Sequence, residues 1–146
     1  MDDTVIYDTD IEHFAIGYLY SDGQYVSARV SIRSGAFAGV SSVCLLKTDI
    51  QSFYESLVQI DKDLFGTCSI YDCDTDDYLK FEMSEYGRIL VSGQLGGSGG
   101  QFIKYRFRAD QTILLRLIEL FEEFLNNEEA FSINPIKRFS QELSAD

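Results

Sequence analysis

The side chains best suited to chemistry are one histidine and three cysteines in a chain of 146 residues. His13 has no cysteine or aspartate at the spacing of a nucleophile and its base, so no general acid–base site is predicted around it. Cys44, Cys68 and Cys73 contain no C-x-x-C pair, and together with His13 they match no zinc-ligand pattern. We therefore expect reduced thiols packed as small apolar side chains, with no catalytic residue, metal or cofactor.

An acidic segment, residues 72–77, offers the D-x-D-x-D start of a calcium-binding loop. The sixth position of such a loop needs a sharp turn and is normally glycine, but here it is Asp77. The twelfth position should be a glutamate that binds through both oxygens, but here it is Met83. The mismatch favours a solvated acidic turn between two strands over a calcium site.

A glycine-rich segment, Gly96–Gly100, has the composition of a phosphate-binding loop. Such a loop is followed by Lys, then Ser or Thr, and then a helix, whereas an alternating strand pattern follows Gly100. A mobile hairpin tip is favoured, with ligand binding by this loop as the alternative.

Basic side chains recur on the polar faces of several expected strands. One interpretation is pairing across strands with acids such as Glu82, which contributes a few tenths of a kcal/mol for each pair, roughly. The other is a charged, open sheet face used for recognition. The residues concerned are Arg29, Arg33, Lys80, Lys104, Arg106 and Arg108.

The charge balance is strongly acidic, with 12 basic and 24 acidic residues and a net charge of −12. Apolar residues make up 45% and aromatics 14%, which indicates a folded acidic protein and not a disordered tail. Negative charge disfavours nucleic acid and anionic membranes and favours a basic protein partner. The acidic residues expected to meet such a partner are Asp72, Asp74, Asp76, Asp77, Glu119, Glu122 and Glu123.

The chain shows no targeting signal that we can identify. No segment approaches the roughly 20 apolar residues of a membrane span, and the acidic N-terminus lacks the basic start and apolar run of a signal peptide. We expect a cytoplasmic protein.

Period-two alternation predicts antiparallel strands in both halves of the chain. The expected strands cover residues 14–20, 26–32, 37–46, 67–71, 78–83, 89–95 and 103–109.

Two segments have helical periodicity instead. The first runs from Thr48 to about Ile60 and begins with the spacing of a capping box, Thr48 to Gln51. The second runs from Gln111 to about Asn126 behind a capping Asp110.

These elements predict an α+β fold: one antiparallel sheet of six to seven strands, with two amphipathic helices packed on one face. We expect a single domain over residues 1–146, with a core of about 12–126 and a C-terminal tail, 127–146, that holds a last helical turn around residues 136–143. No internal repeat is evident.

The stretch from Phe102 to Leu120, FIKYRFRADQTILLRLIEL, joins a strand to a Leu-rich helix through Asp-Gln-Thr. Upstream, GAFAG at 35–39 begins a strand that leads to TDI at 48–50, and LKF at 79–81 precedes GRILVSG at 87–93. In this order the segments resemble the WapI-type immunity proteins of bacterial polymorphic and contact-dependent toxin systems, over roughly residues 14–124.

The resemblance implies a cytoplasmic immunity protein that binds and neutralises a cognate toxin domain, often a nuclease, by occlusion. It implies no enzyme activity and no cofactor, and it carries over no contact residues. A small-ligand or regulatory protein-binding module, using the polar sheet face or a pocket under Gly96–Gly100, remains the alternative. Exposed edge strands leave both a monomer and a homodimer open.

Overall fold

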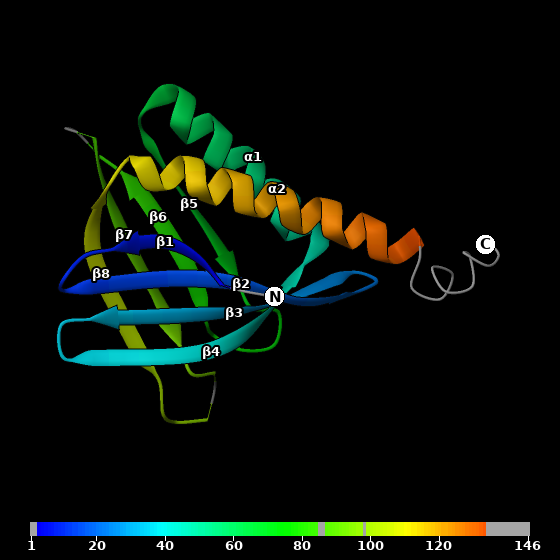
Figure 1. Cartoon of the computed structure of the whole chain (residues 1–146), viewed down its shortest axis with the longest axis horizontal. Helices are drawn as coiled ribbons and strands as arrows, with labels where there is room; N and C mark the ends of the chain where they lie inside the picture. The colour runs from blue at the N-terminus through cyan, green and yellow to red at the C-terminus, as the bar shows by residue number, and fades with distance from the viewer. Residues whose placement is uncertain (1–2, 85–86, 98, 134–146) are drawn as a thin grey trace.

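The computed structural model describes residues 3–84, 87–97 and 99–133, with side chains described up to residue 126. The chain passes twice through the same order of four strands and one helix, and each set of strands forms its own antiparallel sheet (Figure 1). The first set is β1 (Thr4–Asp8), β2 (Glu12–Asp22), β3 (Tyr25–Ser34), β4 (Phe37–Leu46) and α1 (Lys47–Asp63).

The second set follows α1 directly. Within each sheet the strands lie side by side in chain order, so β4 and β8 are edge strands of their sheets. The second set is β5 (Gly66–Tyr71), β6 (Tyr78–Met83), β7 (Arg88–Leu95), β8 (Ile103–Asp110) and α2 (Thr112–Ile133).

The predicted α+β class with two helices is confirmed, but the single sheet is wrong because the structure has two sheets of four strands. Alternation shows which face of a strand is buried, and it does not show which strands share a sheet. The strand missed by the sequence patterns is β1. A bulge between Val5 and Tyr7 interrupts its pairing with β2, and Ile6 is its one fully buried side chain.

The two sheets pack through aromatic side chains on their inner faces. Phe14 of β2 lies 6.1 Å, between ring centroids, from Phe81 of β6 and 6.2 Å from Phe107 of β8. Tyr7 of β1 also stacks on Phe107 at 5.8 Å. Such pairs add about 0.5–1.5 kcal/mol each to the area that they bury.

The helices lie side by side across the upper side of the sheets (Figure 1). Helix α1 packs on β5, and α2 packs on β1 and β2. No described helix is long and apolar enough to cross a membrane.

Only one of the two predicted helix caps is present. Helix α1 begins at Lys47, and its cap residue Leu46 offers no side-chain hydrogen bond, so the capping box predicted at Thr48 is wrong. Before α2, Asp110 Oδ1 accepts the Thr112 N–H at 2.9 Å and also the Thr112 hydroxyl, which confirms the second cap. These hydrogen bonds lower the pKa of the Asp110 carboxyl.

Both helices extend beyond their predicted ends. The first continues from Ile60 to Asp63 and the second from Asn126 to Ile133, into the expected tail. The helical turn expected around 136–143 lies outside the described residues.

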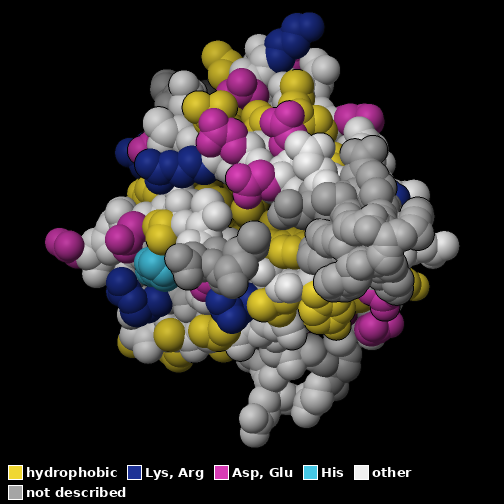
Figure 2. All heavy atoms as spheres, turned by 45° about the vertical axis from the view of Figure 1, so that its right-hand side comes forward, with side chains coloured by type: hydrophobic (Ala, Val, Ile, Leu, Met, Phe, Trp, Pro, Cys, Tyr) yellow, Lys and Arg dark blue, Asp and Glu magenta, His cyan; other side chains and the backbone are white. Residues whose placement is uncertain are grey.

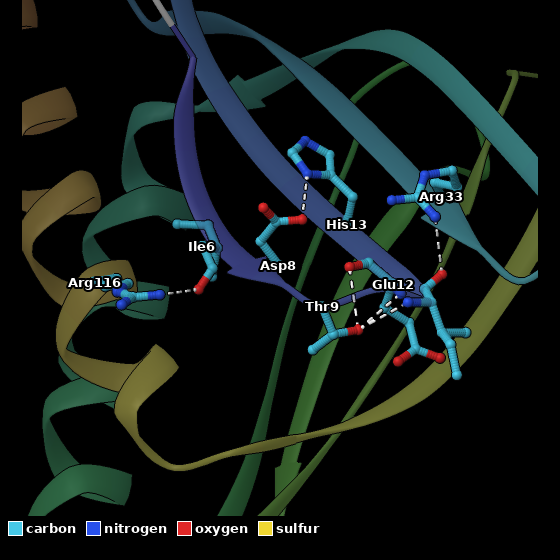
Figure 3. Close-up of polar contacts among 8 residues, drawn as sticks. Ile6, Asp8, Thr9, Glu12, His13, Arg33 and Arg116 are labelled. Carbon is cyan, nitrogen blue, oxygen red and sulfur yellow. Dashed lines mark hydrogen bonds and ion pairs between the residues drawn. The ribbon is translucent and has the colours of Figure 1, made fainter.

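The bulge in β1 is also where helix α2 is hydrogen-bonded to the first sheet. Arg116 of α2 donates to the Ile6 carbonyl at 2.9 Å (Figure 3). Ile6 is the residue that the irregular register skips, and the guanidinium of Arg116 gives its carbonyl a hydrogen-bond donor from α2.

A substitution of Gly93 tests the packing inside the second sheet. A Cβ at this buried position would overlap the Tyr105 hydroxyl and the Tyr78 carbonyl. We expect Gly93→Ala to lower the free energy of unfolding by about 1–3 kcal/mol, measured by urea denaturation. Gly99, where a Cβ would meet nothing within 4 Å, is the control. Equal stabilities of Gly93→Ala and Gly99→Ala would contradict this packing.

Candidate functional site

The acidic turn after β5 is built around two buried carboxylates. Asp72 accepts the Cys44 N–H at 2.5 Å on one oxygen, and the N–H groups of Asp74 at 3.0 Å and Thr75 at 2.8 Å on the other. The Thr75 hydroxyl also donates to Asp72 at 2.8 Å. Asp72 therefore ties the first sheet to this turn and differs from the solvated side chain that we expected.

Asp77 likewise connects two segments of the chain, here the acidic turn and the glycine-rich tip. Its carboxylate is 1% exposed and accepts the N–H groups of Gly96 at 3.2 Å and Gly97 at 2.9 Å. The Gln94 side chain donates to it at 3.3 Å. The start of the predicted mobile tip is thus held by hydrogen bonds to a buried charge. Of the four predicted aspartates of this turn, only Asp74 and Asp76 are exposed.

The predicted acids of α2 point outward. Glu119, Glu122 and Glu123 are all exposed, and the helix buries its apolar stripe against the sheets and α1. Figure 2 shows acidic side chains gathered in the upper part of the view, at the height of the helices in Figure 1. We call the exposed surface of α1 and α2 the helical layer.

A pocket of about 420 Å³ lies between the two helices of this layer. Half-buried Tyr54 and Leu125 give it apolar walls, while Lys47 and Glu122 bring charge to it. Sequence patterns show the apolar stripe of each helix but not that the helices meet, so Tyr54 and Leu125 were missed as site residues. The lining residues are Lys47, Gln51, Tyr54, Glu122, Leu125 and Asn126.

Two of the predicted basic residues have partners within the chain. Arg29 Nη2 pairs with Asp3 Oδ1 at 2.6 Å, and this hydrogen bond raises the pKa of Arg29. Gly17, opposite Arg29 on the neighbouring strand, leaves the room that Asp3 occupies. Arg33 donates to the Ile11 carbonyl at 3.2 Å (Figure 3).

The remaining basic residues lie together on the second sheet. Lys80, Ser92 and Arg106 are neighbours in one row across β6, β7 and β8, and Lys104 and Arg108 occupy adjacent rows. Among the described residues none of these four cations is paired with a carboxylate, so the predicted pairing with Glu82 is not found. We call Lys80, Lys104, Arg106 and Arg108 the basic face.

A shallow groove runs beside the basic face, between the edge strand β4 and the glycine-rich tip. Phe37 is 73% exposed at its rim, and Phe102 and Ile103 line both of its parts, of about 470 and 510 Å³. The groove lies near Gly96–Gly100, where the small-ligand alternative places a pocket, and its charged lining residues are Lys104 and Arg106.

The histidine and the thiols form no nucleophile–base pair in the described part of the chain. His13 Nδ1 of β2 lies 3.2 Å from Asp8 Oδ1 at the end of β1 (Figure 3). Burial raises the pKa of the Cys68 thiol to about 12. Desolvation, the Cys44 thiol and nearby carboxylates raise the pKa of Cys73 likewise to about 12. Both thiols stay protonated at neutral pH, which is unfavourable for nucleophilic attack.

Comparison with known families matches residues 9–129 to the immunity protein WapI-like family. The match spans most of the chain, so the chain belongs to this family and the resemblance found in the sequence is confirmed. No curated protein matches the sequence.

Solved structures share the fold at low sequence identity. MRP1/MRP2 of Trypanosoma bruciei superposes with a TM-score of 0.54 and 15% identity, over 90% of this chain and 86% of that one. WHY1 of Arabidopsis thaliana gives 0.50 and 14%, over 99% and 96% of the two chains. The plant transcriptional regulator PBF-2 gives 0.52 and 11%, over 98% and 87%. These similarities show the fold alone.

Replacing Asp77 tests whether this aspartate is structural. We expect Asp77→Ala to lower the free energy of unfolding by about 1–3 kcal/mol, because the change leaves the N–H donors of Gln94, Gly96 and Gly97 without this acceptor. Exposed Asp76→Ala is the matched control and should change stability by less than about 0.5 kcal/mol. Urea denaturation measures both, and a destabilised Asp76→Ala with an unaffected Asp77→Ala would reverse the assignment.

Proposed function

We propose that this chain is a non-catalytic immunity protein that binds a cognate toxin domain and neutralises it by occlusion, in the cytoplasm. The observation that carries the proposal is the match of residues 9–129 to the WapI-like immunity family. The net charge of −12 favours a basic toxin domain, such as a nuclease that must itself hold phosphates.

The helical layer is the contact surface that we propose. Leu115, which is 59% exposed, precedes Glu119 and Glu122 by one and two helical turns, so the three share one face of α2. On α1 the exposed Val58 stands between Glu55 and Asp61 at the same kind of spacing. Apolar side chains ringed by charge are typical of interfaces, where the charges steer and orient the partner.

The pocket between the helices supplies an anchoring point within this surface. Interfaces concentrate binding energy where one large side chain fills a pocket and is shielded from water. Tyr54 and Leu125 suit the apolar stem of an arginine or lysine, and Glu122 would then accept its charged end. Asp72 and Asp77 are not part of the proposed contact, because the chain itself occupies their oxygens.

Neutralising the acids of α2 tests the contact surface. We expect Glu119→Gln/Glu122→Gln/Glu123→Gln to bind the toxin domain encoded beside this gene at least about tenfold more weakly. Titration calorimetry and protection of growth on co-expression are the readouts. The control is Asp10→Asn/Asp22→Asn/Glu82→Gln, which removes three exposed charges elsewhere.

The control variant separates local contact from overall charge. It should bind within about threefold of the wild type at physiological salt, where remote charges are screened. If both variants weaken binding equally, net charge alone would account for the loss, and the helical layer would not be the contact surface. If the wild type forms no complex and gives no protection, the immunity role itself is wrong for this toxin.

The basic face is the second candidate surface, favoured because its four cations pair with no carboxylate among the described residues. Lys104→Gln/Arg106→Gln/Arg108→Gln tests it in the same assay. The helical-layer proposal expects this variant to bind within about threefold of the wild type, because its charges lie outside the contact. A tenfold loss here, with the α2 variant unaffected, would move the contact to the sheet.

A further inference from the structure

Two cysteines that lie far apart in the sequence meet where the two sheets join. Cys44 is near the end of β4, and Cys73 follows β5 in the acidic turn. The Cys73 N–H donates to the Cys44 carbonyl at 2.9 Å. Both sulfur atoms and a carboxylate oxygen of Asp74 lie within 4.8 Å of one another.

The backbone around these three side chains is already fixed by Asp72. One of its oxygens accepts the N–H of Cys44, and the other accepts the N–H of Asp74. A single buried carboxylate therefore holds the chain segments that carry the three groups. These bonds fix the backbone and not the ligand atoms themselves, and a fixed backbone reduces the reorganisation that metal binding would require.

The ligand types select the class of ion. Two thiolates and one carboxylate suit Zn²⁺, which takes four ligands in a tetrahedron with Zn–S of about 2.3 Å and Zn–O of about 2.0–2.2 Å. A tetrahedron of these bonds places its ligand atoms roughly 3.5–3.8 Å apart, so no pair in the cluster would need to approach by more than about 1.3 Å. Ca²⁺ needs six to eight oxygens, and the oxygens of Asp72, in the same turn, already accept hydrogen bonds from the chain.

We propose that Cys44, Cys73 and Asp74 form a Zn²⁺ site that links β4 of the first sheet to the turn between β5 and β6 of the second. Exposed Cys73 and Asp74 leave the fourth position open to water. Binding replaces the thiol protons, which pass to solvent, and involves no change of oxidation state. The site is independent of the proposed toxin contact, which lies on the helical layer.

The test uses the purified full chain, kept reduced with a phosphine and freed of metal. Titration with Co²⁺ should give one equivalent of bound ion with a near-ultraviolet thiolate-to-cobalt absorption that Zn²⁺ abolishes. Zn²⁺ should also raise the thermal unfolding midpoint, because it binds the folded state. The absence of the absorption band would overturn the proposal.

Cysteine variants locate the site. Cys44→Ser and Cys73→Ser should each lower Zn²⁺ affinity by at least about 100-fold, more than the loss of an outer hydrogen bond costs. The third cysteine provides the control, since Cys68→Ala should leave affinity unchanged. Cys73 is in an exposed turn, so Cys73→Ser keeps the test valid if Cys44→Ser does not fold. Unchanged affinity in Cys73→Ser, as with an ion held at His13 and Asp8, would contradict the assignment.

Discussion

Contact between aromatic rings from both halves of the chain organises this structure. Phe53 of α1 lies edge-on to Phe121 of α2, with 4.9 Å between ring centroids, and 6.0 Å from Phe81 of β6. Phe81 in turn lies 6.1 Å from Phe14 of β2. Four elements, two from each half, thus share one apolar cluster. Each helix also packs on strands of the other half, α1 on β5 and α2 on β1 and β2, so the two halves cover each other.

This packing decides which charges reach the surface. Because the apolar stripe of α2 packs on Phe53 and the sheets, Glu119 and Glu122 lie on the exposed side of the helix. In the second sheet, Phe107 points inward, so Arg106 and Arg108 on either side of it point outward. The acidic helical layer and the basic face are therefore two consequences of one core. A protein with net charge −12 can in this way present surfaces of opposite sign.

Much of the local structure could be predicted from sequence, because local periodicity reports burial directly. Seven of the strands and both helices follow from the spacing of apolar residues, and Asp110 was recognisable as a cap. Features that depend on tertiary contact could not be predicted. The division into two sheets, the Arg116 hydrogen bond to Ile6 and the pocket beside Tyr54 all arise between distant segments.

The acidic turn, residues 72–77, shows most clearly that tertiary contacts cannot be predicted from local sequence. Its aspartates look alike in the sequence, but Asp72 and Asp77 face backbone N–H groups from β4 and the glycine-rich tip, whereas Asp74 and Asp76 face solvent. Which carboxylate is structural depends on donors supplied by other elements. The approach of Cys44 to Cys73 depends on the same contact, and no local spacing signals it.

The central claim is that the helical layer binds the toxin domain. Nuclear magnetic resonance tests it most directly: the isotope-labelled chain is titrated with an inactive form of the toxin domain encoded beside its gene. The account predicts that the largest shift changes fall on exposed positions of α1 and α2, around Val58, Leu115 and Glu122. Changes confined to the outer side of β6–β8, around Lys80 and Arg106, with the helices unaffected, would contradict it.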